Sequence, residues 1–215
     1  MSDNLIFTLW GIGGYILGSI PFGLVLCYLA GYGDIRKIGS GNIGATNVLR
    51  TGNKWLALLT VILDASKAAI AAILAYHYTS SKPFIVFDFI TQFNIVACLL
   101  AGFAAVIGHN FPIWLKFKGG KGVASAFGFI LVTQPAVAGL AFLTWLFMAF
   151  TFKYSSLAAI SAALLTPLFA FFLCEPVYTI CYTALALLVV VRHHANIKRL
   201  LTGQESKIKL KKESK

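Results

Sequence analysis

The stretch Trp55–Tyr78 reads WLALLTVILDASKAAIAAILAYHY and is the clearest indication of fold class in this chain. It exceeds the roughly 20 apolar residues that a helix needs to cross the hydrocarbon core of a bilayer. Six further apolar runs occur, at Leu5–Ala30, Phe84–Ile107, Val123–Thr133, Ala136–Phe152, Leu157–Cys174 and Val177–Val191. Together they predict an all-α integral membrane protein with seven transmembrane helices, some of them short or broken.

The composition agrees with a bilayer as the solvent. Hydrophobic residues make up 59% of the 215 residues and charged residues 12%, against about 25% charged residues in soluble domains. The mean hydropathy is +0.82. These values exclude a soluble single-core enzyme and a disordered chain. They also disfavour an outer-membrane barrel, because the apolar residues do not alternate with polar ones.

The chain is also strongly basic, with a formal net charge of +11. Loops rich in Lys and Arg face the cytoplasm, and seven spans place almost all of these residues on one face, with the N-terminus outside and the C-terminus in the cytoplasm. Merging the short run Val123–Thr133 with the next run across Pro135 would place Lys153 outside. We therefore expect one polytopic membrane domain over residues 1–200 and a basic cytoplasmic tail over residues 201–215. The tail is interpreted as an arm on anionic lipid, and no nucleic-acid partner is expected.

Three predicted cytoplasmic segments have compositions unlike those of simple connectors. The first, Gly31–Gly52, reads GYGDIRKIGSGNIGATNVLRTG. Its glycines let the backbone approach a ligand, and its hydroxyl, amide and basic side chains add donors, as in an anion cradle. A flexible loop kept soluble by small residues remains the alternative.

The second segment, Gly108–Ala124, reads GHNFPIWLKFKGGKGVA. Its glycines and lysines, Lys118 to Gly122, lead into a predicted helix, whose N-terminal N–H groups favour anions. This predicts a phosphate site, with a basic loop at a helix junction as the alternative. His109 by itself is more typical of an interfacial histidine than of a catalyst.

The third segment follows the last apolar run and reads RHHANIKR, from Arg192 to Arg199. On a continuing helix His193, Asn196 and Arg199 would share a face and suit a polar substrate head, although a cluster of residues at the membrane exit is also common. Midway along the second span, Asp64 and Lys67 lie three residues apart. Charges at that depth form structural pairs or line functional cavities, and both interpretations stay open.

The sequence shows no Cys–His or Ser–His–Asp set, no acyltransferase motif of the H-x-x-x-x-D type and no metal-ligand cluster. All four cysteines lie inside apolar runs without metal-ligand spacing, which indicates packing roles. The chain therefore offers anion-binding groups more than strong nucleophiles.

Five short motifs resemble those of the bacterial membrane acyl-phosphate:glycerol-3-phosphate acyltransferases (PlsY-type), in order and over essentially the whole chain. They are Gly18-Ser19-Ile20-Pro21, SGNIGATNV (Ser40–Val48), Gly108-His109, FKGGKGVA (Phe117–Ala124) and His193-x-x-Asn196-Ile197-x-Arg199-Leu200. Asp64-x-x-Lys67 is similar to that family's second helix, although Ala68 stands where the family often has glycine.

The resemblance implies a seven-helix enzyme of the bacterial cytoplasmic (inner) membrane with its active site facing the cytoplasm. It would transfer a fatty acyl group from acyl phosphate to the 1-hydroxyl of sn-glycerol 3-phosphate, giving lysophosphatidic acid and phosphate for phospholipid biosynthesis, without a cofactor. The catalytic residues expected are Ser40, Lys118, His193 and Asn196. The substrate-binding residues expected are Ser40, Gly41, Asn42, Gly44, Thr46, Asn47, Arg50, Lys67, His109, Lys118, Gly119, Gly120, Lys121, Gly122, His193, Asn196 and Arg199. The alternative function is transport of an organophosphate anion, for which broken helices and basic loops would also be suited.

Overall fold

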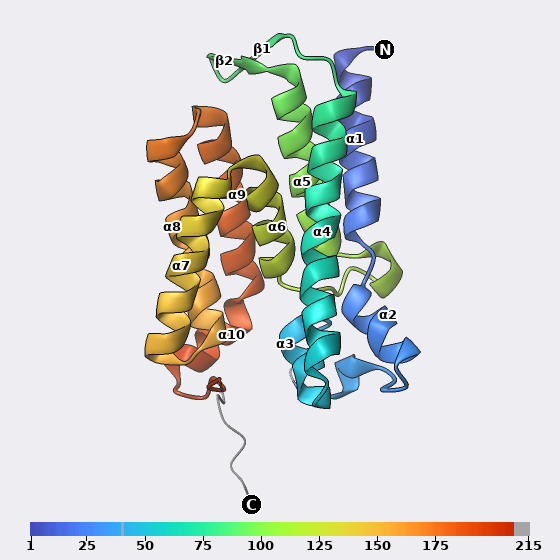
Figure 1. The fold of residues 1–215 in the computed structure, drawn as a ribbon, viewed down its shortest axis with the longest axis vertical. Coiled ribbons are helices and arrows are strands. Elements are labelled where there is room, and N and C mark those ends of the chain that lie inside the picture. The colour runs from blue at the N-terminus through green and yellow to red at the C-terminus, as the bar shows by residue number, and fades with distance from the viewer. Residues whose placement is uncertain (40, 209–215) are drawn as a thin grey trace, which may run out of the picture. The chain divides into compact units, whose positions relative to one another are not determined.

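The fold is described by a computed structural model that covers residues 1–39 and 41–208. The chain forms two compact units, Met1–Thr133 and Gln134–Lys215, and we describe each by itself. Both are helical (Figure 1).

The first unit contains four long or medium helices and several short ones. In chain order the elements are α1 (Asp3–Gly18), α2 (Phe22–Leu29), η1 (Ile35–Lys37), α3 (Ala45–Val48), η2 (Leu49–Thr51), α4 (Lys54–Tyr78), β1 (Pro83–Val86), β2 (Phe89–Gln92), α5 (Phe93–Asn110), η3 (Ile113–Leu115) and α6 (Val123–Thr133). The first apolar run is therefore interrupted. The first helix ends at Gly18, and the next begins at Phe22, directly after Pro21. Proline is accepted at the start of a helix but breaks its interior.

Small residues let the helices of this unit approach closely. A Cβ on Gly14 or Gly18 of α1 would overlap the backbone oxygen of Ala101 or Ala105 in α5. A Cβ on Gly128 of α6 would likewise overlap the Ala65 oxygen in α4. Such small-residue contacts are typical of helix packing inside membranes, and here they hold α1 to α5 and α6 to α4.

The predicted helix Phe84–Ile107 is wrong in its first part. Residues from Pro83 to Gln92 form an antiparallel hairpin, in which Phe84 pairs with Thr91 and Ile85 with Ile90. The helix begins only at Phe93. Aromatic and β-branched residues favour strands as well as apolar helices, so hydropathy could not separate the two here.

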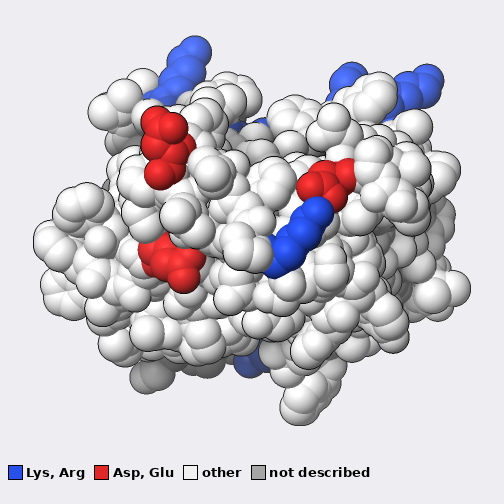
Figure 2. All heavy atoms as spheres, turned by 90° about the horizontal axis from the view of Figure 1, so that it is seen from above, with Lys and Arg blue, Asp and Glu red and all other residues white. Residues whose placement is uncertain are grey.

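The hairpin lies at the same end of the first unit as the start of α1. There Lys82 forms an ion pair with Asp3, 2.6 Å between Nζ and Oδ1. Figure 2 looks onto this end and shows charged side chains scattered among uncharged ones. Neither Lys82 nor Asp3 belongs to the three polar segments identified in the sequence.

The second unit consists of α7 (Pro135–Phe152), α8 (Ser155–Leu173), α9 (Pro176–Arg192) and α10 (His194–Leu201). α8 packs against both α7 and α9. Pro135 and Pro176 occupy the first helical positions of α7 and α9, where a missing N–H costs nothing.

The described residues include five helices long and apolar enough to cross a membrane, or six if the bent pair α9–α10 counts as one span. The predicted run Val123–Thr133 is a separate helix, α6, with the bounds expected, but it is too short to be counted among them. A multi-pass helical membrane protein is thus supported, and the seven-span topology with its orientation stays a prediction.

Candidate active site

The first polar segment folds into a compact loop around the side chain of Asn47. The Asn47 amide nitrogen donates hydrogen bonds to the backbone oxygens of Ile35 and Asn42, both at 2.8 Å. The side chain is buried, so Asn47 supports the loop from within. Gly41, Asn42, Gly44, Thr46 and Arg50 lie at or near the surface. Ser40 lies outside the described residues.

Arg50 lies across the backbone of this loop. A Cβ on Gly39 would overlap the Arg50 guanidinium and would lie 2.5 Å from Asn47 Oδ1, and Gly39 has a φ of +57°. Glycine is therefore required at position 39 for both its backbone conformation and the approach of Arg50. The other arginine of the loop, Arg36, is paired with Asp34, 2.6 Å between Nη2 and Oδ2. The hydrogen bonds from Arg36 lower the pKa of Asp34 to about 2, so this pair is charged at physiological pH.

The second polar segment forms a glycine loop, Lys118–Gly122, which lies on the C-terminal end of α5. The backbone nitrogen of Gly120 donates to the His109 oxygen at 2.9 Å, and that of Gly119 donates to the Asn110 oxygen at 3.2 Å. A Cβ on Gly120 would overlap the His109 ring. Gly122 has a φ of +79°, and α6 starts at the next residue. The predicted junction between glycine loop and helix is thus confirmed, with Lys118 exposed and Lys121 half-buried.

The first two segments belong to one end of the first unit. Leu115, in the second segment, packs against the buried cluster that includes Ile35, Ile43 and Val48 of the first segment. The fold therefore brings two polar segments that are far apart in the sequence into contact through this apolar cluster.

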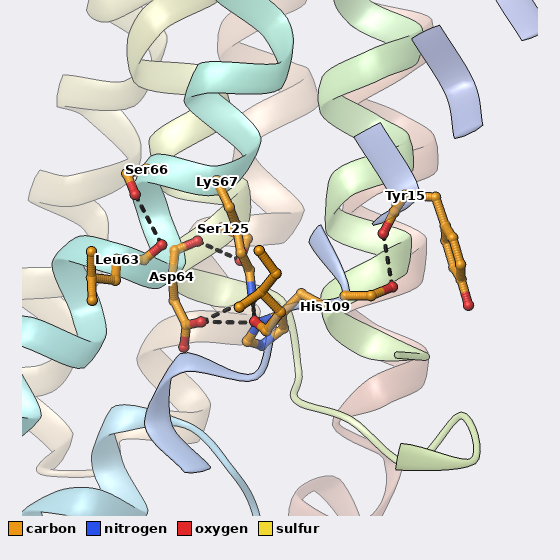
Figure 3. Close-up of polar contacts among 9 residues, drawn as sticks. Tyr15, Leu63, Asp64, Ser66, Lys67, His109 and Ser125 are labelled. Carbon is orange, nitrogen blue, oxygen red and sulfur yellow. Dashed lines mark hydrogen bonds and ion pairs between the residues drawn. The ribbon is translucent and has the colours of Figure 1, made fainter. Parts of the chain in front are cut away.

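The buried charges of α4 lie next to His109, near the end of α5 (Figure 3). Lys67 Nζ lies 2.9 Å from Asp64 Oδ1 and donates to the Ile20 oxygen at 3.0 Å. His109 Nδ1 lies 3.5 Å from the same Asp64 oxygen. All three side chains are buried, with 1% to 4% of their surface exposed. Lys67 and His109, expected from the resemblance to contact substrate, thus lie in the interior with Asp64.

The third polar segment is bent. α9 ends at Arg192 and α10 begins at His194, with a 60° change of direction, so the expected continuing helix across His193 is wrong. His193 Nδ1 lies 2.7 Å from the Val189 oxygen. Since a carbonyl oxygen only accepts, Nδ1 carries a proton, so that whenever the ring is neutral its lone pair is on Nε2.

Asn196 and Arg199 lie on α10, where both donate to Glu205. Asn196 Nδ2 donates to Oε1, and Arg199 Nε donates to Oε2, each at 2.6 Å. Ser156 of α8 also donates to Oε1 at 2.6 Å. Burial raises the pKa of Glu205, but these three hydrogen bonds together with the charge of Arg199 outweigh it, and the net pKa is lowered.

Sequence reasoning missed Glu205 and Ser156. Glu205 was included in a basic tail without a role, and Ser156 in the start of an apolar run. The one available signal was an acidic side chain six residues after Arg199 in an otherwise basic tail.

The donor set of the three segments is dominated by lysine and arginine side chains, which suit anions such as phosphate. The Gly119 and Gly120 N–H groups and the Asn47 amide donate within the protein. Within the described ranges no three His, Cys, Asp or Glu side chains are grouped as metal ligands.

Comparison with known proteins agrees with this donor set. Residues 8–203 match the family model described as glycerol-3-phosphate acyltransferase. A glycerol-3-phosphate acyltransferase of Rhodospirillum rubrum is 52% identical over 212 residues, which cover 98% of this chain and 94% of that protein.

Two crystal structures of PlsY (YgiH), an integral membrane glycerol 3-phosphate acyltransferase, have similar folds. The glycerol 3-phosphate form has a TM-score of 0.83 and 38% identity, over 94% of this chain and 96% of that chain. The lysophosphatidic acid form has a TM-score of 0.81 and 37% identity, over 94% of each chain. These similarities, with the apolar helices, define a multi-pass membrane acyltransferase. The chain belongs to the glycerol-3-phosphate acyltransferase family.

Proposed function

We propose that this protein transfers a fatty acyl group from acyl phosphate to the 1-hydroxyl of sn-glycerol 3-phosphate, giving lysophosphatidic acid and inorganic phosphate. The observation that carries the proposal is the similarity over 94% of the chain to a structure solved in a glycerol 3-phosphate form and to one in a lysophosphatidic acid form. The acyl-phosphate donor rests on the motif resemblance. It also agrees with the anion-binding character of the polar segments.

The reaction forms one carbon–oxygen bond and breaks another, and the hydroxyl proton passes to a base or to a phosphate oxygen. The glycerol hydroxyl oxygen attacks the acyl carbonyl carbon, the bond from that carbon to the phosphate oxygen breaks, and phosphate leaves with the electron pair. Because acyl phosphate is a mixed anhydride with a good leaving group, a covalent enzyme intermediate is unnecessary. The protein has to hold two phosphates close together and align hydroxyl with carbonyl.

Each polar segment would contribute to these tasks from within its own unit. In the first unit, the loop around Asn47 with Arg50 and the glycine loop with Lys118 and Lys121 would bind phosphate groups and stabilise the oxyanion that develops on the carbonyl. In the second unit, Asn196 and Arg199 would bind a polar substrate group. Ser40 would add a hydroxyl donor.

His193 is the proposed base. Its Nδ1–H is held by the Val189 oxygen at 2.7 Å, so in the neutral ring Nε2 would be the basic atom. The hydroxyl proton would pass to Nε2, or alternatively to a phosphate oxygen of a substrate. Only the first route needs the His193 ring, so substitution of His193 distinguishes the two.

We further propose a bacterial inner-membrane location with these segments at the cytoplasmic face, where Lys and Arg accumulate. The tail beyond α10 would lie on anionic lipid. In the described part of the tail, Lys207 is exposed. Lys209, Lys211, Lys212 and Lys215 lie outside the described residues.

The proposal is tested with purified full-length protein in detergent. Acyl phosphate and glycerol 3-phosphate are supplied together, and phosphate release and lysophosphatidic acid are measured. We expect both products in equal amounts, no release without glycerol 3-phosphate, and no product when acyl-CoA replaces acyl phosphate. Absence of lysophosphatidic acid, together with organophosphate uptake by vesicles containing the protein, would instead support a transporter.

A further inference from the structure

The buried charges of α4 are connected to the glycine loop through His109. Asp64 Oδ1 lies 3.5 Å from His109 Nδ1, and the other side of the His109 ring occupies the space that a side chain on Gly120 would need. The His109 oxygen also accepts the hydrogen bond from the Gly120 nitrogen, at 2.9 Å. One residue of α5 therefore contacts the glycine loop through both its ring and its backbone.

Asp64 and Lys67 also form hydrogen bonds with two neighbouring segments, the start of α6 and the break between α1 and α2. Ser125, in the first turn of α6, donates its hydroxyl hydrogen to the Asp64 backbone oxygen at 2.7 Å (Figure 3). Lys67 donates to the Ile20 oxygen in the break between α1 and α2. The end of α5 and the break between α1 and α2 thus meet the charged side chains of Asp64 and Lys67, and the start of α6 is bonded to the Asp64 backbone.

The geometry of these residues suits support better than substrate contact. Their side chains are almost completely buried, and Lys67 is already bonded to a carboxylate and a carbonyl oxygen. Charged groups at this depth are expensive unless they are paired. A role in holding the loop explains why charged rather than apolar residues stand here.

We infer that Asp64 and His109 are positioning residues for the glycine loop, with Lys67 balancing the charge of Asp64. Asp64 orients the His109 ring, and the ring and backbone of His109 set the position of Gly119 and Gly120 against the start of α6. The inference rests on the proposed function, in which Lys118–Gly122 binds a substrate phosphate, and it assigns to this loop the phosphate of glycerol 3-phosphate. Displacing this loop should weaken glycerol 3-phosphate binding more than it slows chemistry.

The test uses four variants of the full-length protein. His109→Ala removes the ring, and His109→Gln keeps much of its volume and an N–H toward Asp64. The double variant Asp64→Asn/Lys67→Met removes both charges, so that no unpaired charge is left in the interior. Thr60→Val, one turn away on α4 and fully buried, is the matched control.

Two readouts are combined. Kinetics give the KM for glycerol 3-phosphate and kcat, and hydrogen–deuterium exchange follows the peptide around Gly119 and Gly120. For His109→Ala and the double variant we expect KM to rise about tenfold, as for other supporting residues, with kcat changed by less and amide exchange faster in the loop. His109→Gln should lie closer to wild type, and Thr60→Val should leave KM and loop exchange unchanged.

Unchanged KM and loop exchange in folded variants would overturn the inference. So would a collapse of kcat at constant KM, which would place His109 in the chemical step. If the wild-type protein makes no lysophosphatidic acid, the proposed function fails, and the exchange measurement alone still decides whether Asp64 and His109 position the loop.

Discussion

His193 stands at the bend between α9 and α10, where its ring is anchored by a backbone oxygen of its own helix. The anchor uses the Nδ1 side of the ring and so determines which nitrogen can accept a proton. A surface histidine without such a bond would exchange between tautomers.

Substitution of His193 separates the two routes for the hydroxyl proton. If His193 is the base, His193→Ala and His193→Gln should both lower kcat by about 100-fold or more, the contribution typical of general-base catalysis. Steady-state kinetics with saturating substrates measure this directly. Retention of most of kcat in both variants would mean that a substrate phosphate takes the proton.

Glu205 should make the stability of the second unit sensitive to acid. Its pKa is lowered in the folded state, so its contribution is fully present above the unfolded pKa of about 4.3 and is lost as pH falls through the lower folded-state pKa. We expect Glu205→Gln to unfold at a lower temperature than wild type at pH 7, and the gap to close at acidic pH. Thermal unfolding in detergent between pH 3 and pH 7 gives both curves. A gap that persists unchanged at pH 3 would contradict the assignment.

The site residues were only partly predictable from the sequence. Glycine, lysine and histidine clusters in a chain otherwise poor in polar residues identified the loops. The hydrogen bonds from Ser156 and Asn196 to Glu205 join residues 49 and 9 positions apart, and no local pattern encodes such contacts. The same holds for His109, whose ring meets a loop that follows it and a carboxylate on the preceding span.

Helix α1 packs on α5 through one side only, as two adjacent glycines show. Gly13 and Gly14 are neighbours, but only Gly14 faces α5. A Cβ on Gly14 would overlap the Ala101 oxygen, whereas one on Gly13 has nothing within 4 Å.

This pair provides a matched test of the α1–α5 contact. Gly14→Ala should destabilise the protein by about 1–3 kcal/mol, as overpacking does, while Gly13→Ala should be neutral or stabilising by up to about 1 kcal/mol through helix propensity. Unfolding in a denaturing detergent series compares the two. Equal effects in the two variants would show that α1 does not pack on α5 through this face.

Hydropathy located the helices well but did not locate their breaks. Five of the seven predicted runs each coincide with one helix, and Val123–Thr133 matches α6 residue for residue. The run Leu5–Ala30 is divided between α1 and α2, and Phe84–Ile107 begins with the hairpin. The hairpin was missed because its turn uses Phe87 and Asp88 at positive φ and not glycine, the usual turn signal. The bend at His193 lacks proline or glycine and so left no mark in the sequence.

For the molecule as a whole, the excess of basic residues predicts the orientation in the membrane. An alkaline phosphatase inserted near Ser81 should be active, because that loop is expected outside. Green fluorescent protein fused to the C-terminus should fluoresce, because that end is expected in the cytoplasm. The reverse pattern in cells would contradict the orientation and with it the cytoplasmic site.

The reaction itself is tested most directly by isotope tracing. Glycerol 3-phosphate carrying ¹⁸O in its 1-hydroxyl is incubated with acyl phosphate and the purified protein, and both products are analysed by mass spectrometry. Attack of the hydroxyl on the acyl carbonyl predicts that the label is retained in the ester of lysophosphatidic acid and that the released phosphate is unlabelled. Label in the phosphate, or the absence of lysophosphatidic acid, would contradict direct acyl transfer.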